Sequence, residues 1–513
     1  MQGWPDAAIS AAHTAEDRTG CVDAFGQTIH LLRPESATAE NRLDRNGYVV
    51  CFPEALDFNE EKGFEINGYD IRIMPLYNLR KEICMTFQNK LTDNQVEANF
   101  KLAAEQYGAL GVDVEQAVDD ALSVPISLHC WQGDDVVGFE VNEEEVSGGG
   151  IMATGNYPGK ANTADELRQD LKKVVDLLPG PQRVNLHAFY CETEGQVVGR
   201  DALEPKHFAR WINWAKEHDI GLDFNPTYFA HPKANDGYTL AHADKGIRDF
   251  WIQHGIASRR IAEAMGQELG KECVNNHWAP DGAKDHPADR SAPRQRMIES
   301  YDAIFDEALG IGADCVDAVE GKLFGLGCED YTVGSNDFYS NYALTRDKVL
   351  CLDMGHFHQT ESIADKISAH LPFHKKLLIH TSRPIRWDSD HVVLFSDDVR
   401  NVFLEVGRMR VLDRIYVALD FFDASINRIG AYVVGTRATR KALLYGLVDP
   451  SELLRTLEAE DKLAQKLALM EEMKTMPFSA VWDMLCLKSD VPLRAAWLDD
   501  METYERDVLA QRG

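Results

Sequence analysis

The sequence lacks several features that mark whole classes of protein. No stretch approaches the roughly 18 uninterrupted apolar residues of a membrane-spanning helix, and the start, MQGWPDAAISAAHTAEDRTG, has neither the basic region nor the apolar region of a secretory signal. The 53 Lys and Arg residues are outnumbered by 83 Asp and Glu residues, and the net charge of -30 repels nucleic acid phosphates and anionic lipid. We therefore expect a cytoplasmic protein that binds neither nucleic acid nor membrane.

Cofactor-binding fingerprints are also missing. The ten cysteines are scattered and form no C-x-x-C pair for zinc or redox chemistry, so we expect buried, reduced thiols. No G-x-G-x-x-G fingerprint with a following acidic residue is evident. The segment GNYPGK at residues 155–160 is one residue short of a phosphate-binding loop, and Ala161 follows where Ser or Thr should bind magnesium. We interpret this segment as a turn.

The sequence does contain a long alternation of apolar, β-branched runs with amphipathic stretches such as PKHFARWINWAKEH. The eight runs cover residues 126–131, 183–190, 220–228, 272–278, 314–322, 348–357, 376–383 and 414–423. Eight strand-and-helix units are typical of an α/β fold of the (β/α)8 TIM barrel type, and each run ends in polar residues where the active-site face of such a barrel lies. An open doubly wound sheet is the alternative that the pattern leaves open.

The barrel prediction divides the chain into four parts. Residues 126–436 form the predicted catalytic barrel, residues 85–125 a short helical segment before it, and residues 437–513 a C-terminal helical extension. Residues 1–84 hold weak strand signals and no cluster of chemically active side chains, so they stay unassigned.

Metal-ligating side chains gather at the ends of the last four predicted strands, which a barrel brings together. They are Glu320, Asp353, His356, His380, Asp388, Asp390 and Asp420. An isolated carboxylate at a strand end is more often a helix cap, and a histidine in an apolar run is usually a core residue. Seven such residues on four consecutive strands favour metal binding instead.

The spacing of these residues suggests two metal sites. Three carboxylates of the set with His380 would make a closed site of nitrogen and oxygen ligands, and His356 with Asp388 and Asp390 would make a site with positions left for water or substrate. The D-x-D spacing gives one metal two carboxylates from one loop. Histidine in both sites favours manganese, cobalt or zinc over magnesium.

The motifs SLHCWQGDD, ATGNYPGKA, GLDFNPT, VEGKLFG, YTVGSNDFY, LDMGHFH, SRPIRWDSDHVV and LDFFDASINR resemble the L-rhamnose isomerase family from about Met85 to the C-terminus. The resemblance implies a manganese-dependent (β/α)8 barrel, with two metal sites per subunit, that interconverts L-rhamnose and L-rhamnulose as a cytoplasmic homotetramer. It also implies that Glu320, Asp353, His380 and Asp420 hold a structural metal, and that His356, Asp388 and Asp390 hold the catalytic metal. Spacing alone does not decide whether Asp420 or Asp423 is the ligand, because Asp423 follows Asp420 by only three residues.

The family pattern starts near Met85, so residues 1–84 are either an added extension or lie upstream of the true start. For the chemistry we expect an intramolecular hydride shift, because the carbons that exchange oxidation state are adjacent in one sugar. Lys322 could place an ammonium beside the developing negative charge, or could pair with a ligand carboxylate. Two alternative functions stay open. The chain could be another metal-dependent sugar isomerase or epimerase on the same barrel, or a sugar-binding protein without activity.

Overall fold

The computed structural model describes residues 18–22, 28–32, 63–66, 69–72 and 91–512, apart from 142–150, 152, 311–313, 324–329, 359 and 386–387. In the four short N-terminal ranges and in residues 383–385 and 388–390, only the backbone is described. The chain forms two compact units, Met1–Cys84 and Met85–Gly513. In the first unit, β1 (Arg18–Val22) pairs with β2 (Thr28–Leu32) and β3 (Gly63–Ile66) pairs with β4 (Tyr69–Arg72), both antiparallel.

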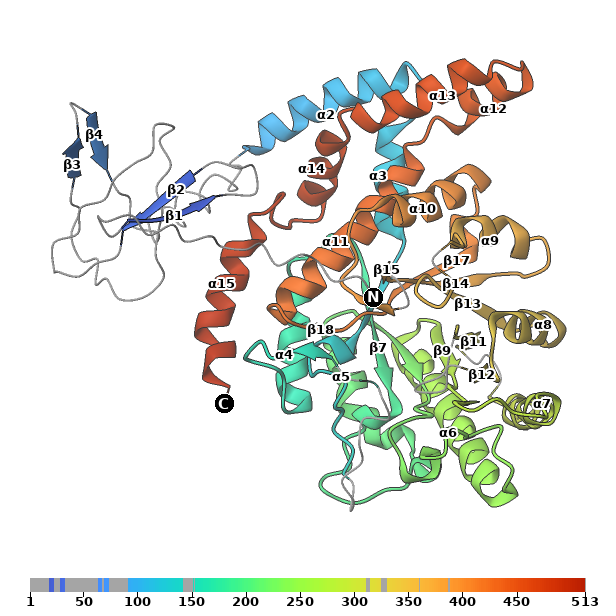
Figure 1. Ribbon diagram of the computed structural model, residues 1–513. Coiled ribbons are helices and arrows are strands. Elements are labelled where there is room, and N and C mark those ends of the chain that lie inside the picture. Colours follow the sequence, from blue (N-terminus) through green and yellow to red (C-terminus); the bar gives the residue numbers. More distant parts are fainter. Residues whose placement is uncertain are drawn as a thin grey trace. The chain divides into compact units, whose positions relative to one another are not determined.

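The second unit is built around a closed barrel of parallel strands (Figure 1). In chain order the strands are β5 (Ile126–His129), β7 (Gln182–His187), β8 (Gly221–Asn225), β9 (Cys273–Trp278), β11 (Cys315–Glu320), β13 (Val349–Asp353), β14 (Leu377–Thr381) and β17 (Ile415–Leu419). Seven of the predicted runs contain one of these strands and the eighth overlaps β7, which begins one residue before its run, and the last strand pairs with the first through Val417 and Ile126. The prediction of a (β/α)8 barrel is confirmed.

A layer of helices surrounds the barrel (Figure 1). One helix follows each strand: α4 (Ala164–Val175), α5 (Ala209–Glu217), α6 (Lys245–Leu269), α7 (Ser291–Phe305), α8 (Asn336–Arg346), α9 (Ile363–His370), α10 (Asp397–Met409) and α11 (Arg428–Leu447). In α4 the buried residues Leu167, Leu171 and Val174 recur at helical spacing, and Thr163 caps the first turn by accepting from Glu166 N. No helix among the described residues has both the length and the apolar character to cross a membrane.

Further helices flank the barrel unit at both ends of its sequence. They are α2 (Asp93–Gly108), α3 (Val114–Ser123), α12 (Ser451–Ala459), α13 (Leu463–Glu472), α14 (Phe478–Lys488) and α15 (Trp497–Asp507). Helix α2 packs against α14, and their buried side chains form a second core with α3. The boundary expected between residues 436 and 437 falls inside α11, so the barrel and the C-terminal helices share one continuous helix.

The barrel strands bury both faces, because alternate residues point inward and outward. Leu350 and Leu352 of β13 face the helices in the main core, whereas Cys351 between them belongs to a small inner core. The other buried members of that inner core are Val274, Ala318, Leu378 and Ala418, from four neighbouring strands. The residues two positions further along these strands therefore form the next inward-facing layer, at the carboxyl end of the barrel.

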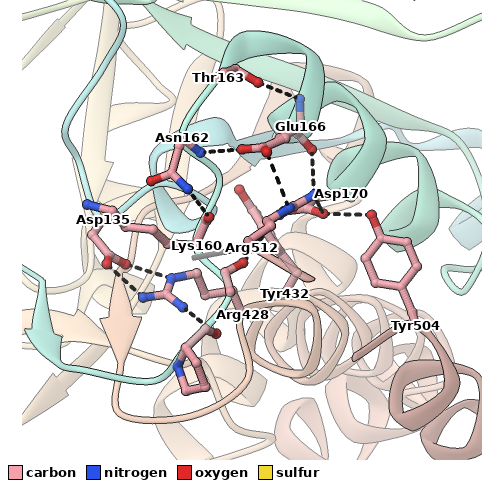
Figure 2. Close-up of polar contacts among 12 residues, drawn as sticks. Asp135, Lys160, Asn162, Thr163, Glu166, Asp170, Arg428, Tyr432, Tyr504 and Arg512 are labelled. Atoms are coloured by element: carbon pink, nitrogen blue, oxygen red, sulfur yellow. Dashed lines mark hydrogen bonds and ion pairs between the residues drawn. The ribbon is translucent and has the colours of Figure 1, made fainter. Parts of the chain in front are cut away.

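The C-terminal residues are tied to α4 by a buried ion pair (Figure 2). Arg512 donates to both oxygens of Asp170, at 2.7 and 2.8 Å, and Tyr504 of α15 donates to Asp170 at 2.7 Å. Arg512 also donates to the carbonyl of Gly159 at 3.2 Å. The side chains of Arg512 and Asp170 are only 5% and 2% exposed, so water screens this ion pair little.

A second buried arginine, Arg428 at the start of α11, holds two loops at once (Figure 2). Its Nε and Nη2 each lie 2.7 Å from a carboxylate oxygen of Asp135, and its Nη1 donates to the carbonyl of Tyr157 at 2.8 Å. The segment GNYPGK thus runs as a loop with a bend at Pro158, and the two arginines hold it by its backbone carbonyls.

Replacing Arg512 with Met should lower the free energy of unfolding by roughly 3–5 kcal/mol, because the Asp170 carboxylate stays buried without its cation. The measurement is urea denaturation followed by circular dichroism. Arg506→Met is the control, since Arg506 is exposed and, within the described part of the chain, forms an ion pair only with the adjacent Asp507. The double variant Asp170→Asn with Arg512→Met should recover part of the loss. An equal loss in both arginine variants would contradict the importance of the buried pair.

Candidate metal centre and cavity

Four side chains converge at the carboxyl end of the barrel. Glu320 and Asp353 are the last residues of β11 and β13, His380 lies in β14, and Asp420 directly follows β17. One ligand atom from each residue lies within 4.8 Å of the ligand atoms of the other three. Since all four belong to the inward-facing layer above the small inner core, the alternation of the strands positions them.

His380 lies at the centre of this group. Its Nδ1 is 3.5 Å from Glu320 Oε2, 3.5 Å from Asp353 Oδ2 and 3.7 Å from Asp420 Oδ2. Burial alone would lower the pKa of His380, but the neighbouring Cys351, Glu320, Asp353 and Asp420 raise it well above its usual value. The surroundings therefore strongly favour positive charge at this point.

Neighbouring groups orient the three carboxylates. Asn276 donates to Glu320 Oε2 at 2.6 Å, Ser382 donates to Asp353 Oδ1 at 3.0 Å, and the indole of Trp131 donates to Asp420 Oδ1 at 3.0 Å. These bonds leave the other oxygen of each carboxylate for a further partner, as is usual for carboxylates that ligate metals.

Buried polar atoms without hydrogen bonds indicate which kind of ligand the four-residue group can bind. Both ring nitrogens of His380, Oε1 of Glu320 and Oδ2 of Asp353 are buried without a hydrogen-bond partner in the described part of the chain. Buried polar atoms are normally satisfied, so such a concentration requires an explanation. A divalent cation with carboxylate and imidazole ligands fits this set, because it would bind one ring nitrogen of His380 together with carboxylate oxygens and would offset the repulsion between the carboxylates.

His356 lies beside this group. Its Nδ1 is 2.9 Å from Glu320 Oε1, and its Nε2 is 3.1 Å from the ammonium of Lys322. The imidazole stacks on Trp278, with ring centroids 6.4 Å apart, and Lys322 Nζ lies 5.4 Å from the centre of the Trp278 ring. Glu320 therefore contacts His356 with one oxygen and faces His380 with the other, and His356 presents Nε2 to a cationic group.

Asp388 and Asp390 are described by their backbone alone. Both belong to β16 (Asp388–His391), which pairs antiparallel with β15 (Arg383–Ile385), Asp390 opposite Arg383 and Asp388 opposite Ile385. This hairpin follows β14, the strand that carries His380. Their side chains lie outside the described residues, so their grouping with His356 stays a prediction.

A cavity of about 350 Å³ lies at the carboxyl end of the barrel, and its volume is in the range of small-molecule sites. Among its lining residues are Glu320, Lys322, His356, His380 and Asp420. Asp423 also lines it but is not a member of the four-residue group, and its Oδ1 accepts from Ser425 instead. The geometry therefore groups Asp420, and not Asp423, with the other three side chains.

Sequence analysis missed three polar residues of this cavity, His187, Asn225 and Asn276, which lie at or near the carboxyl ends of β7, β8 and β9. Applying the strand-end rule to the first half of the barrel would have found them. Among aromatic residues near the carboxyl ends of the strands, Trp131 and Trp278 line the cavity, whereas Phe189 and Phe357 are core residues that do not.

Comparison with known proteins places these residues in a family. The model of the L-rhamnose isomerase family matches residues 94–512. The L-rhamnose isomerase of Yersinia pseudotuberculosis serotype IB (strain PB1/+) is 52% identical over 419 residues, which is 82% of this chain and 100% of that protein. That of Citrobacter koseri (strain ATCC BAA-895 / CDC 4225-83 / SGSC4696) is 52% identical over 418 residues, which is 82% of this chain and 99% of that protein.

Solved structures with a similar arrangement include an L-ribulose 3-epimerase, with a TM-score of 0.39 and 12% identity over 66% of this chain and 98% of that chain. Another is the 3-keto-D-glucoside 4-epimerase of E. coli, with a TM-score of 0.37 and 13% identity over 57% of this chain and 98% of that chain.

If the four-residue group binds a cation, adding Mn²⁺ to chelator-treated protein should stabilise the fold by about 2.7 kcal/mol when the free ion is at 100 times its dissociation constant. Glu320→Gln should remove most of this gain, because it takes away a charged ligand. The measurement is the urea midpoint with and without Mn²⁺. Asp281→Asn is the matched control: Asp281 is a buried carboxylate that accepts from Thr239 and Ala241, outside the group. A full gain in Glu320→Gln would exclude Glu320 as a ligand.

Proposed function

The chain belongs to the L-rhamnose isomerase family, and we propose that it interconverts L-rhamnose and L-rhamnulose by an intramolecular hydride shift at a site for two divalent cations. The identity of 52% extends over the whole length of a relative named L-rhamnose isomerase. The single observation that carries the chemistry is the cluster of Glu320, Asp353, His380 and Asp420, of which Glu320, His380 and Asp420 line a cavity of suitable size for a sugar.

In this proposal Glu320, Asp353, His380 and Asp420 hold the structural cation, and His356, Asp388 and Asp390 hold the catalytic one. Manganese is the preferred ion, with cobalt or zinc as substitutes, because the donor set mixes imidazole with carboxylates. The bound cations supply Lewis acidity that polarises the two sugar oxygens. Glu320 couples the sites, since it lies against both His356 and His380.

The reaction needs no separate redox cofactor, because one carbon of the sugar is oxidised as its neighbour is reduced. Hydride passes between C1 and C2, and one proton moves between their oxygens. Lys322 directs its ammonium at His356 in the cavity and supplies positive charge where negative charge develops on the substrate. Trp131, Trp278, Phe229 and Phe422 form an apolar part of the cavity wall that excludes water.

The family also implies a homotetramer, which we include in the proposal. Light scattering of the purified protein on a sizing column would measure the assembly directly, and a monomer would contradict this part alone.

The decisive experiment is an assay of chelator-treated protein with L-rhamnose, with and without Mn²⁺, in which the sugars are separated by chromatography. We expect L-rhamnulose only when the metal is present, and none from Asp388→Asn at an unchanged circular dichroism spectrum. An epimer in place of the ketose would assign a different chemistry to the same barrel. Sugar binding without product under any divalent ion would contradict catalysis.

Lys322→Met should lower kcat by about 10²–10³-fold with little change in KM, because the ammonium acts mainly on charge that develops in the transition state. Steady-state rates with L-rhamnose measure both constants. Lys366→Met is the control, since Lys366 packs over Phe357 and does not line the cavity. A kcat within a few-fold of the parent protein would indicate that Lys322 serves only as an ion-pair partner.

A further inference from the structure

A thiol lies directly below the metal-binding group. Cys351 of β13 precedes Asp353 by two residues, so the two side chains share the inward face of the strand and lie roughly 6–7 Å apart along it. In the pairing of β11 with β13, Cys351 is the register partner of Glu320. From the sequence this cysteine, like the other nine, is expected to be a buried reduced thiol.

Burial in an apolar core explains most cysteines of this kind, because the thiol behaves as a small apolar group. Cys351 differs from such cysteines because its neighbours carry atoms that can ligate a metal ion. Ligand atoms of Glu320, Cys351 and His380 all lie within 4.8 Å of one another, and each of the three residues is 2% exposed. Both ring nitrogens of His380 and Oε1 of Glu320 have no hydrogen-bond partner among the described residues.

We propose that Cys351, Glu320 and His380 form an alternative metal position, deeper in the barrel than the four-residue group and selective for soft divalent cations such as Zn²⁺ and Cd²⁺. Thiolate ligands favour these ions, whereas a group of carboxylates with one imidazole suits Mn²⁺. The two positions share Glu320 and His380, so a soft cation held by Cys351 competes with the ion that Asp353 and Asp420 help to hold.

Binding at this position is an exchange of a proton for a metal ion. The Sγ–H bond of Cys351 breaks, a bond from Sγ to the cation forms, and the proton leaves to solvent. No electron is transferred and no oxidant is required. Because the deeper position removes two of the four ligands from the upper one, a Zn²⁺ or Cd²⁺ ion bound there competes with Mn²⁺, whereas a Zn²⁺ ion bound by the four-residue group would take the place of Mn²⁺.

The test uses the full chain, reduced and treated with a chelator, and Cd²⁺ alone as the probe. We expect an ultraviolet charge-transfer band from thiolate to Cd²⁺ that saturates at a single ion per chain, and displacement of bound Mn²⁺ as the band appears. Electron paramagnetic resonance of free Mn²⁺ measures the displacement. No sugar or turnover enters the experiment, so its result is independent of the proposed isomerase activity.

Two cysteine variants make the assignment specific. Cys351→Ser should lose the band and retain Mn²⁺ through the four-residue group. Cys273→Ser should keep the band, since Cys273 is equally buried in a barrel strand but faces the helices. Glu320→Gln tests the same position with Cys351 intact and should weaken Cd²⁺ binding. Absence of the band in the parent protein, or its persistence in Cys351→Ser, would overturn the proposal.

Discussion

The close approach of Glu320 to two histidines is the contact on which the whole site depends. One carboxylate oxygen lies 2.9 Å from His356 and the other lies 3.5 Å from His380. Asn276 holds the second oxygen from the neighbouring strand β9. A small rotation of this side chain would therefore change both histidines together, which explains why it sits at the end of a rigid strand rather than in a loop.

Crowding of carboxylates at the barrel mouth has an energetic cost that the barrel must offset. Three acidic side chains and one imidazole have ligand atoms within 4.8 Å of one another, and the mutual repulsion of the three carboxylates in a buried setting is substantial without a cation. The parallel strands hold their backbones in register, Asp353 opposite His380, so the side chains cannot separate without breaking the barrel. The fold is thus stable enough to keep a site that is unfavourable in its unbound form.

The strand pattern predicted the barrel because each strand is buried on both faces and therefore appears as a short run with apolar residues on both faces. The same runs gave the ligand residues of β11, β13 and β14, which follow the inner core residues at a spacing of two. The polar residues of β7, β8 and β9 that line the cavity were missed, because an isolated histidine or asparagine in an apolar run is usually a hydrogen-bonded core residue. Contacts such as Arg512 with Asp170 could not be predicted, because they join residues 342 positions apart through the tertiary fold alone.

At least one loop around the cavity is held by a buried ion pair and not by strand register. Asp135 and Val136 both have positive φ, 60° and 62°, a conformation that is strained for a β-branched residue such as Val136. Val136 nonetheless lines the cavity, and the bidentate contact of Arg428 with Asp135 holds the strained segment in place. Strand register therefore positions the candidate metal ligands, whereas the buried Arg428 of α11 holds one loop of the cavity wall. Changes of sugar preference can then arise in the loops while the metal-binding layer of the barrel stays the same.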